Sequence, residues 1–148
     1  MEIEHLTNPT DADLDALTAL WEASVRATHH FLAPDEPELY RPLVRQEALP
    51  AADLYLVRRP DGRPAAFLGL YGEKIEMLFV APDRLRQGLG RQLIHHAVMR
   101  CGARQVDVNE ENTAARDFYA RMGFRVVARD AKDPSGRNHP ILHLAIEK

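Results

Sequence analysis

The chain has 148 residues, of which 45% are hydrophobic and 28% are charged, and its formal net charge is -3. This composition is typical of a soluble globular protein, and the length predicts one domain over residues 1–148 with a sizeable core. The slightly acidic balance argues against nucleic-acid binding as the main task, and the single cysteine excludes an internal disulfide. Because we recognise neither a secretory signal nor a membrane span, we expect a cytoplasmic protein that does not bind membranes.

The predicted elements begin with a short strand at 2–6 and a helix that starts at Pro9-Thr10-Asp11 and runs to about residue 28. A second helix spans about 36–47, where Pro42 must lie in the first turn or kink the helix. The later elements are strands at 54–58, 64–71 and 74–80, a helix at 91–101, a strand at 104–108, a helix that starts at Asn112, and strands at 124–129 and 140–146.

A basic turn with two glycines, residues 82–90, joins the strand at 74–80 to the following helix. Gly88 and Gly90 carry no side chain, so the backbone can approach an anion closely. The first N–H groups of a helix lack intrahelical partners, and the helix dipole favours negative charge there. Positively charged side chains surround the turn, namely Arg84, Arg86 and Arg91. We infer a site for a phosphate-bearing ligand, although the glycines alone also suit an ordinary tight turn.

A second segment, residues 106–124, predicts a strand, a polar turn and an amphipathic helix. Asn112 suits the N-cap of this helix, and Gly123 is placed to end it in the left-handed conformation. The resulting pattern is Asn112-x-x-Ala115-x-x-Phe118-Tyr119-x-x-x-Gly123-Phe124.

Together the two segments resemble the core motifs of the GNAT superfamily of N-acetyltransferases. In that family a strand is followed by Arg/Gln-x-x-Gly-x-Gly/Ala at the start of a helix, and later by Asn-x-x-Ala-x-x-Phe-Tyr-x-x-x-Gly-Phe. Both motifs occur here in that order, within residues 73–128. The shorter matches resemble the YjaB-type bacterial branch of the family, and they are Ala27-Thr28-His29-x-Phe31-Leu32 and Asn109-Glu110-x-Asn112.

The resemblance implies an α/β fold of the α+β kind, with a mixed central sheet flanked by helices in the order β-α-α-β-β-β-α-β-α-β-β. It also implies acetyl-CoA as the acetyl donor, without a metal ion, and an amine as the acceptor. The pantetheine arm would run beside strand 75–80, and the pyrophosphate would lie at the start of the next helix. The cofactor-binding residues implied in this way are Leu78, Phe79, Val80, Arg86, Gln87, Gly88, Leu89, Gly90, Arg91, Asn112 and Tyr119.

One position departs from the family pattern, because Leu85 stands where the family has Arg or Gln. The contact of that side chain is therefore absent, and we expect Arg84 or Arg86 to supply the charge instead. The phosphate contacts of the family are mostly backbone N–H groups, so the ligand class is expected to be unchanged.

By the same resemblance, Tyr119 is the expected general acid, which protonates the departing CoA thiolate. A packed aromatic residue on a helix face is the alternative interpretation of this tyrosine. A general base is also required, because an ammonium group has no lone pair with which to attack a thioester.

Glu76 is the first candidate for that base, since strand alternation predicts it on the same face as Leu78 and Val80. Its neighbours Ile75, Met77 and Phe79 are then expected on the opposite face. The other candidates for the base are Asp107, Glu73 and His29. His29, together with Glu76, is also expected in the acceptor pocket.

The acceptor itself stays open at this point: a small amine or amino acid, an aminoglycoside-like drug and a peptide or protein N-terminus all remain. Family acceptors enter through segments that correspond to residues 26–50 and 129–140.

A non-catalytic sensor or subunit that binds acetyl-CoA or CoA is the alternative function. Homodimers are common in the family, and nothing in the sequence decides the oligomeric state. His139 and His143 are four residues apart but lie in a region whose pattern indicates strand, so we do not expect a helical metal pair.

Overall fold

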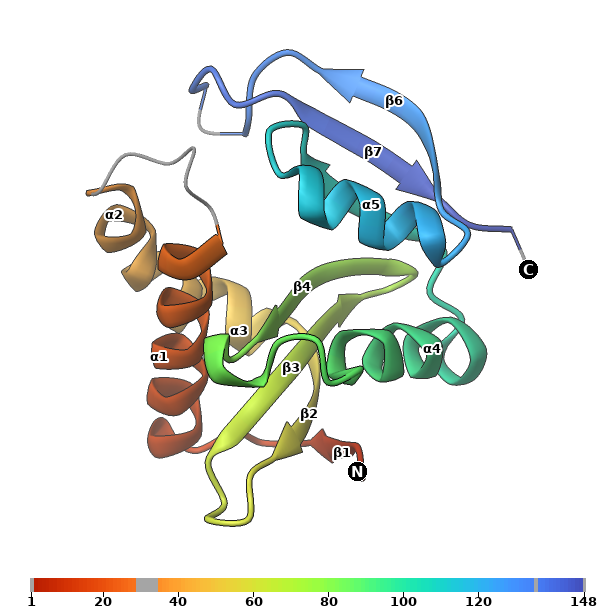
Figure 1. Ribbon diagram of the computed structural model, residues 1–148. Coiled ribbons are helices and arrows are strands. Elements are labelled where there is room, and N and C mark those ends of the chain that lie inside the picture. The colour runs from red at the N-terminus through yellow and green to blue at the C-terminus, as the bar shows by residue number, and fades with distance from the viewer. Residues whose placement is uncertain (1, 29–34, 135, 148) are drawn as a thin grey trace.

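The computed structural model describes residues 2–28, 35–134 and 136–147, and their strands form one mixed sheet in the order β1-β2-β3-β4-β5-β7-β6 (Figure 1). All neighbouring strands are antiparallel except β4 and β5, which are parallel. The strands are β1 (Glu4–Leu6), β2 (Asp53–Arg58), β3 (Pro64–Tyr71), β4 (Lys74–Val80), β5 (Gln105–Asn109), β6 (Arg125–Asp130) and β7 (Ile141–Ala145). The helical segments are α1 (Asp11–Thr28), α2 (Glu36–Leu43), η1 (Val44–Ala48), α3 (Leu49–Ala51), η2 (Pro82–Arg84), α4 (Leu89–Cys101) and α5 (Thr113–Arg121). The predicted order of elements is confirmed.

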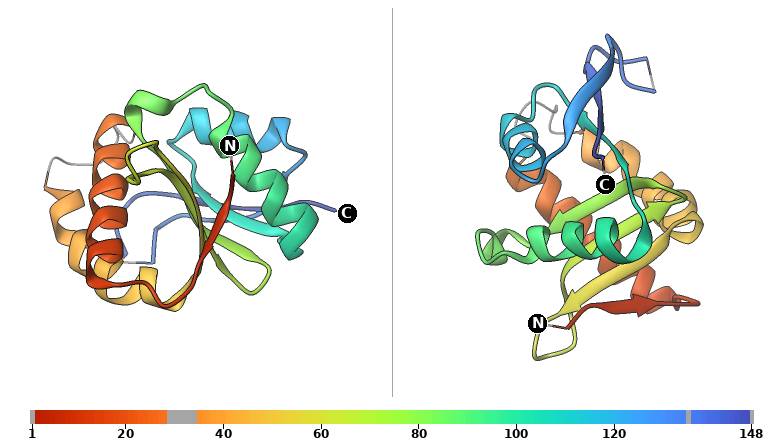
Figure 2. Two further views of the ribbon diagram at one scale, coloured as in Figure 1. Left: turned by 90° about the horizontal axis from the view of Figure 1, so that it is seen from below. Right: turned by 90° about the vertical axis from the view of Figure 1, so that its right-hand side faces the viewer.

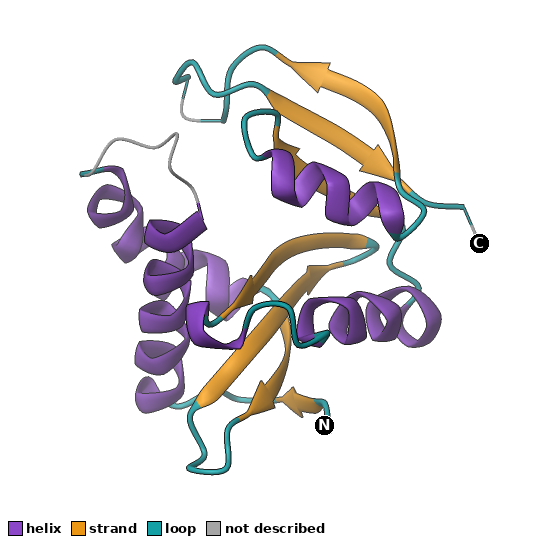
Figure 3. Cartoon of the chain, in the orientation of Figure 1, coloured by secondary structure: helices purple, strands orange, loops and turns teal. Residues whose placement is uncertain are grey.

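Helices cover both faces of the sheet, with α1, α2 and α3 on one side of the strands and α4 and α5 on the other (Figures 2 and 3). Two apolar cores result. One joins α4 and α5 to the sheet around Leu93 and Ile94, and the other joins α1 to the sheet around Leu17 and Phe67. Within the described ranges, no helix is long and apolar enough to cross a membrane.

A local sequence signal marks the start of α1. At α1 the Asp13 amide donates to Thr10 Oγ1 over 3.1 Å and the Thr10 amide donates to Asp13 Oδ2 over 2.9 Å, which forms a reciprocal capping box. The second predicted helix extends further than expected, through a π-helical turn at Val44–Ala48. Pro42 lies inside α2, just before this turn, and because it lacks an N–H group it interrupts the regular hydrogen-bond pattern there.

The sheet opens at one point, and this opening creates the candidate site. In the register of β3 and β4, Leu70 pairs with Ile75 and Gly69 with Met77, so Glu76 is the extra residue of a β-bulge. β4 and β5 are paired only over the first residues of each strand, up to Ile75 and its partner Val106. Beyond that pair the two strands diverge, and we call this point the fork.

The bulge also overturns one expectation from the sequence. Regular alternation predicts Ile75 and Met77 on the same face, but Ile75 packs in the core under α4 and Met77 packs in the core under α1. The extra residue at Glu76 shifts the side-chain alternation by one position, because each inserted residue reverses the faces that follow it.

Candidate active site

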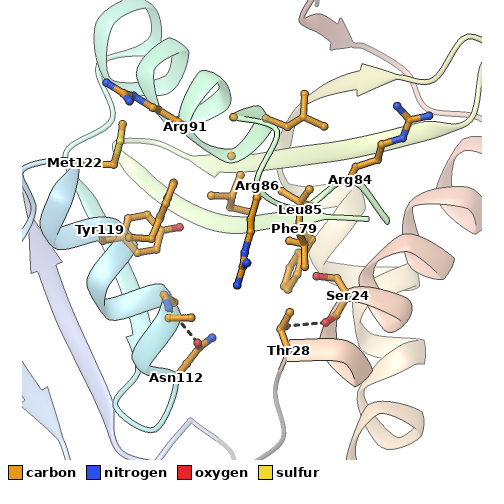
Figure 4. A pocket seen from close by; sticks show the side chains of 18 of the residues that line it. Ser24, Thr28, Phe79, Arg84, Leu85, Arg86, Arg91, Asn112, Tyr119 and Met122 are labelled. Carbon is orange, nitrogen blue, oxygen red and sulfur yellow. Dashed lines mark hydrogen bonds between the residues drawn. The ribbon is translucent and has the colours of Figure 1, made fainter. Parts of the chain in front are cut away.

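A cleft of about 890 Å³ lies beyond the fork, between α1 on one side and α5 on the other (Figure 4). The second half of β4, the loop that follows it and the first turn of α4 complete its lining. All of the cofactor-binding residues predicted from the sequence line this cleft except Gln87, which is exposed in the loop. Two distant segments of the sequence, residues 78–91 and 112–122, therefore meet at one site.

The α4 end of the cleft is suited to an anion. Gly88 is the N-cap of α4 with φ 81° and ψ 8°, and no side chain caps the helix. The first i to i-4 hydrogen bond runs from the Gln92 amide to the Gly88 carbonyl over 2.9 Å. The preceding amides, at residues 89–91, have no acceptor within the helix and lie at its positive end, where an anionic ligand is stabilised.

The loop before α4 is held in an unusual conformation. Arg86 has φ 64°, in the left-handed region that costs a non-glycine residue about 1–2 kcal/mol. Its side chain extends into the cleft between the α1 and α5 walls, whereas Arg84 and Arg91 point away from the centre (Figure 4). Arg86 is thus the arginine best placed to compensate for Leu85, which also lines the cleft.

A bidentate ion pair anchors the start of this loop. The guanidinium of Arg59, the residue after β2, donates to both oxygens of Asp83, each over 2.7 Å. These hydrogen bonds lower the pKa of the Asp83 carboxyl to about 2. The loop at the α4 end of the cleft is therefore fixed to the β2–β3 turn.

Tyr119 lies at the base of the α5 wall, with only 5% of its surface exposed. Its ring makes edge contacts with Phe118 and Phe124, at centroid distances of 5.1 and 5.5 Å. Burial raises the pKa of the Tyr119 hydroxyl above its ordinary value, so it is protonated at neutral pH. The hydroxyl points into the cleft (Figure 4), where it can donate a proton.

Local signals position the remaining α5 residues of the site. Asn112 is the N-cap, and its Oδ1 accepts from the Ala115 amide over 3.1 Å. Ala115, Phe118 and Met122 recur at helical spacing and line the cleft from the same face. Gly90 of α4 faces this wall, since a Cβ placed there would lie 3.6 Å from the Phe118 ring.

The α1 wall of the cleft contains two side chains that were not named as site residues from the sequence. Ser24 and Thr28 line it, and Thr28 Oγ1 donates to the Ser24 carbonyl over 2.7 Å (Figure 4). Their spacing of four residues puts them on one helix face, but the same spacing describes many solvated helix faces.

Among the candidate bases that the structure describes, Glu76, Asp107 and Glu73 do not line the cleft. Glu76 is exposed at the bulge, 3.7 Å from the Lys74 ammonium. Asp107 on β5 lies 2.8 Å from the same ammonium and 2.7 Å from His143 Nδ1, so Lys74 brings the two carboxylates together at the fork. Glu73 is exposed in the β3–β4 turn. His29, together with Phe31 and Leu32 of the shorter match, lies outside the described residues.

No three histidine, cysteine, aspartate or glutamate side chains are grouped to hold a metal ion in the parts of the chain that the structure describes. His139 and His143 take separate partners. His139 lies between Glu36 and Glu111, whereas His143 lies between Asp107 and Asp130.

Comparison with known proteins identifies the family. The model of the acetyltransferase (GNAT) family matches residues 15–124. The peptidyl-lysine N-acetyltransferase YjaB of Salmonella typhimurium is 38% identical over 130 residues, which cover 88% of this chain and 89% of that protein.

Solved structures show the same fold. The solution structure of apo-form YjaB from Escherichia coli has a TM-score of 0.83 and 34% identity, over 98% of this chain and 97% of that one. A PaiA N-acetyltransferase from Thermoplasma acidophilum, solved in complex with coenzyme A, has a TM-score of 0.74 and 18% identity over the whole of both chains. The motifs, the fold and these relatives together lead to one conclusion: the chain belongs to the GNAT family and is an N-acetyltransferase, an enzyme that transfers an acetyl group to an amine.

Proposed function

We propose that the protein transfers the acetyl group of acetyl-CoA to the side-chain amine of a lysine in a peptide or protein, in the bacterial cytoplasm, and that residues 1–148 form one such domain. The observation that carries this proposal is a single cleft with an uncapped helix N-terminus at one end and a buried tyrosine hydroxyl on its wall. The lysine acceptor is supported by the relative named as a peptidyl-lysine N-acetyltransferase.

The two parts of the donor, its pyrophosphate and its pantetheine arm, would occupy two regions of the cleft. The amides of residues 89–91 and the Arg86 side chain would hold the pyrophosphate. The pantetheine arm would lie against the edge of β4 at residues 78–80, which has no strand partner on the β5 side within the described chain. An extended ligand can pair with such an edge through main-chain hydrogen bonds. These contacts act on donor affinity more than on the chemical step, because they hold substrate and transition state alike.

Transfer requires one proton to leave the acceptor and one to reach the leaving group. The lysine ammonium must lose a proton before its nitrogen can form a bond to the acetyl carbon. As that bond forms and the carbon–sulfur bond breaks, Tyr119 would donate its proton to the sulfur. Because burial raises the pKa of Tyr119, the hydroxyl carries its proton at neutral pH and the proton is available when the thiolate leaves.

The carboxylates at the fork would receive the acceptor. Val106 and Val108 flank Asp107 and pack in the core under α5, so Asp107 lies on the opposite face of the sheet. Glu76 joins it there through the shared contact with Lys74. We propose that the two carboxylates attract the lysine ammonium from this face and that one of them accepts its proton.

The test is acetyl transfer to a synthetic peptide with a blocked N-terminus and one lysine, followed by mass spectrometry and by release of the CoA thiol. The matched control replaces that lysine with norleucine, and parallel reactions contain a free N-terminus, a polyamine or an aminoglycoside. Acetylation of the lysine peptide alone would support the proposal. Transfer only to another amine would contradict the lysine assignment, and binding of acetyl-CoA without any transfer would indicate a CoA-binding sensor.

A further inference from the structure

A charged network lies on the face of β5 and β7 that is turned away from α5. His143 of β7 lies directly opposite Asp107 of β5 in the antiparallel register. His143 Nδ1 is 2.7 Å from Asp107 Oδ1, and His143 Nε2 is 2.8 Å from Asp130 Oδ2 on β6. Each ring nitrogen of His143 therefore has its own carboxylate partner, at distances that allow proton transfer.

The network leads from the fork to solvent. Asp107 directly follows Val106, the last β5 residue that is paired with β4. The exposed fraction of the side chain is 30% at Asp107, 32% at His143 and 67% at Asp130. One end of the network is therefore at the point where the acceptor amine would enter, and the other end is in contact with bulk water.

Lys74 fixes the direction of the network. Its ammonium lies 2.8 Å from Asp107 Oδ2, which leaves Asp107 Oδ1 facing His143. A carboxylate beside an ammonium group is a weak proton acceptor, because the positive charge favours the ionised form. Asp107 can act as a base in successive catalytic cycles only if a second group removes the proton that it has accepted.

We propose that His143 is a positioning residue that orients Asp107 and relays the proton of the acceptor amine from Asp107 to solvent. This inference rests on the proposed function, because the acceptor amine is the source of the proton. The amine N–H bond breaks as the proton moves to Asp107 Oδ1, and the proton then passes to His143 Nδ1. The resulting imidazolium lies between Asp107 and Asp130 until water removes one proton, which restores neutral His143 and both carboxylates.

The charges around His143 determine the pH range in which its ring can accept a proton. Asp130 of β6 and Asp107 of β5 raise the pKa of His143 by hydrogen bonding, with Lys74 and Glu76 of β4 beyond them. Below that pKa the ring already carries both protons and cannot accept another. The turnover number kcat should therefore rise with pH through the pKa of His143.

The experiment compares His143→Ala and His143→Asn with the wild-type protein, using His95→Ala, on the exposed surface of α4, as the matched control. We expect kcat to fall about 100-fold in both His143 variants, at the lower end of the effect of proton-transfer groups. The KM for acetyl-CoA should not change, and the rise of kcat with pH should disappear. Added imidazole should restore the kcat of His143→Ala, because the truncated side chain leaves room for the ring. It should not restore the kcat of His143→Asn.

An Asp130→Asn variant and an NMR titration add two measurements. Neither result would be expected if the role of His143 were purely structural. Asp130→Asn should lower the pKa of His143 and shift the rise of kcat to lower pH. In the wild-type protein the pKa of His143, followed by NMR without any substrate, should lie above the ordinary histidine value of about 6.5.

Two results would overturn the relay: a His143→Asn variant with the wild-type kcat and pH profile, or a His143→Ala variant that imidazole does not restore. Either would leave the proposed function intact, whereas absence of acetyl transfer by the wild-type protein would overturn both.

Discussion

The Gly88→Ala substitution tests the anion end of the cleft with a perturbation whose size follows from the structure. Gly88 has φ 81°, and a Cβ at this position would have no heavy atom within 4 Å. The substitution therefore causes no clash, and its cost is that of a left-handed alanine, about 1–2 kcal/mol. If the loop relaxes to avoid this strain, binding of the donor must return residue 88 to the left-handed conformation. The dissociation constant for CoA then rises about 5- to 30-fold.

Gly102→Ala is the matched control for this prediction. Gly102 caps the other end of the same helix with φ 75° and ψ 20°, and a Cβ there also meets open space. Gly102→Ala should lower the melting temperature by about 2–4 °C for each kcal/mol lost, and Gly88→Ala should lower it less because its loop relaxes in the unbound protein. Calorimetric titration with CoA should show weaker binding for Gly88→Ala alone. Unchanged CoA affinity in Gly88→Ala, with a smaller loss of stability than in Gly102→Ala, would refute the assignment of these amides to the pyrophosphate.

Three further predictions follow from the site and the core. Tyr119→Phe keeps the aromatic packing and removes only the hydroxyl, so kcat should fall about 100-fold with an unchanged KM for acetyl-CoA, and a wild-type kcat would exclude the acid role. Asp83 has its pKa lowered to about 2 by Arg59, so its contribution to stability is complete above the unfolded pKa of about 3.9 and disappears as the pH falls through 2. Urea unfolding of the wild-type and Asp83→Asn proteins should therefore differ at pH 5 and converge near pH 2, and a difference that persists at pH 2 would contradict the ion pair. Leu93→Ala removes a side chain with 0% exposure and should lower the free energy of unfolding by about 2–5 kcal/mol, whereas a loss below about 1 kcal/mol in urea titration would contradict its place in the core.

The parts of the site that the sequence predicts are those with local signals. A glycine pair at the start of α4 and an asparagine N-cap at the start of α5 act within a few residues of their own position. The helix period then places Ala115, Phe118 and Met122 on one face. These elements could be predicted without knowing how the strands pair.

The remaining parts depend on contacts between distant segments. The bulge at Glu76 is set by the register of β3 against β4, and neither glycine nor proline marks it within 74–80. The pairing of Asp107 with His143 requires β7 to lie beside β5, although β6 comes between them in the sequence. Sequence analysis therefore selected Asp107 as a candidate base without its histidine partner.

The most direct test of the central claim is an NMR titration of the 15N-labelled protein with acetyl-CoA, followed through the backbone amide signals. The account predicts saturable shifts that are largest at residues 78–80 and 87–91, with a smaller effect at Asn112, and little change at the far end of the sheet near β1. Absence of saturable shifts, or shifts confined to residues outside the cleft between α1 and α5, would contradict the assignment of this cleft to the acetyl donor.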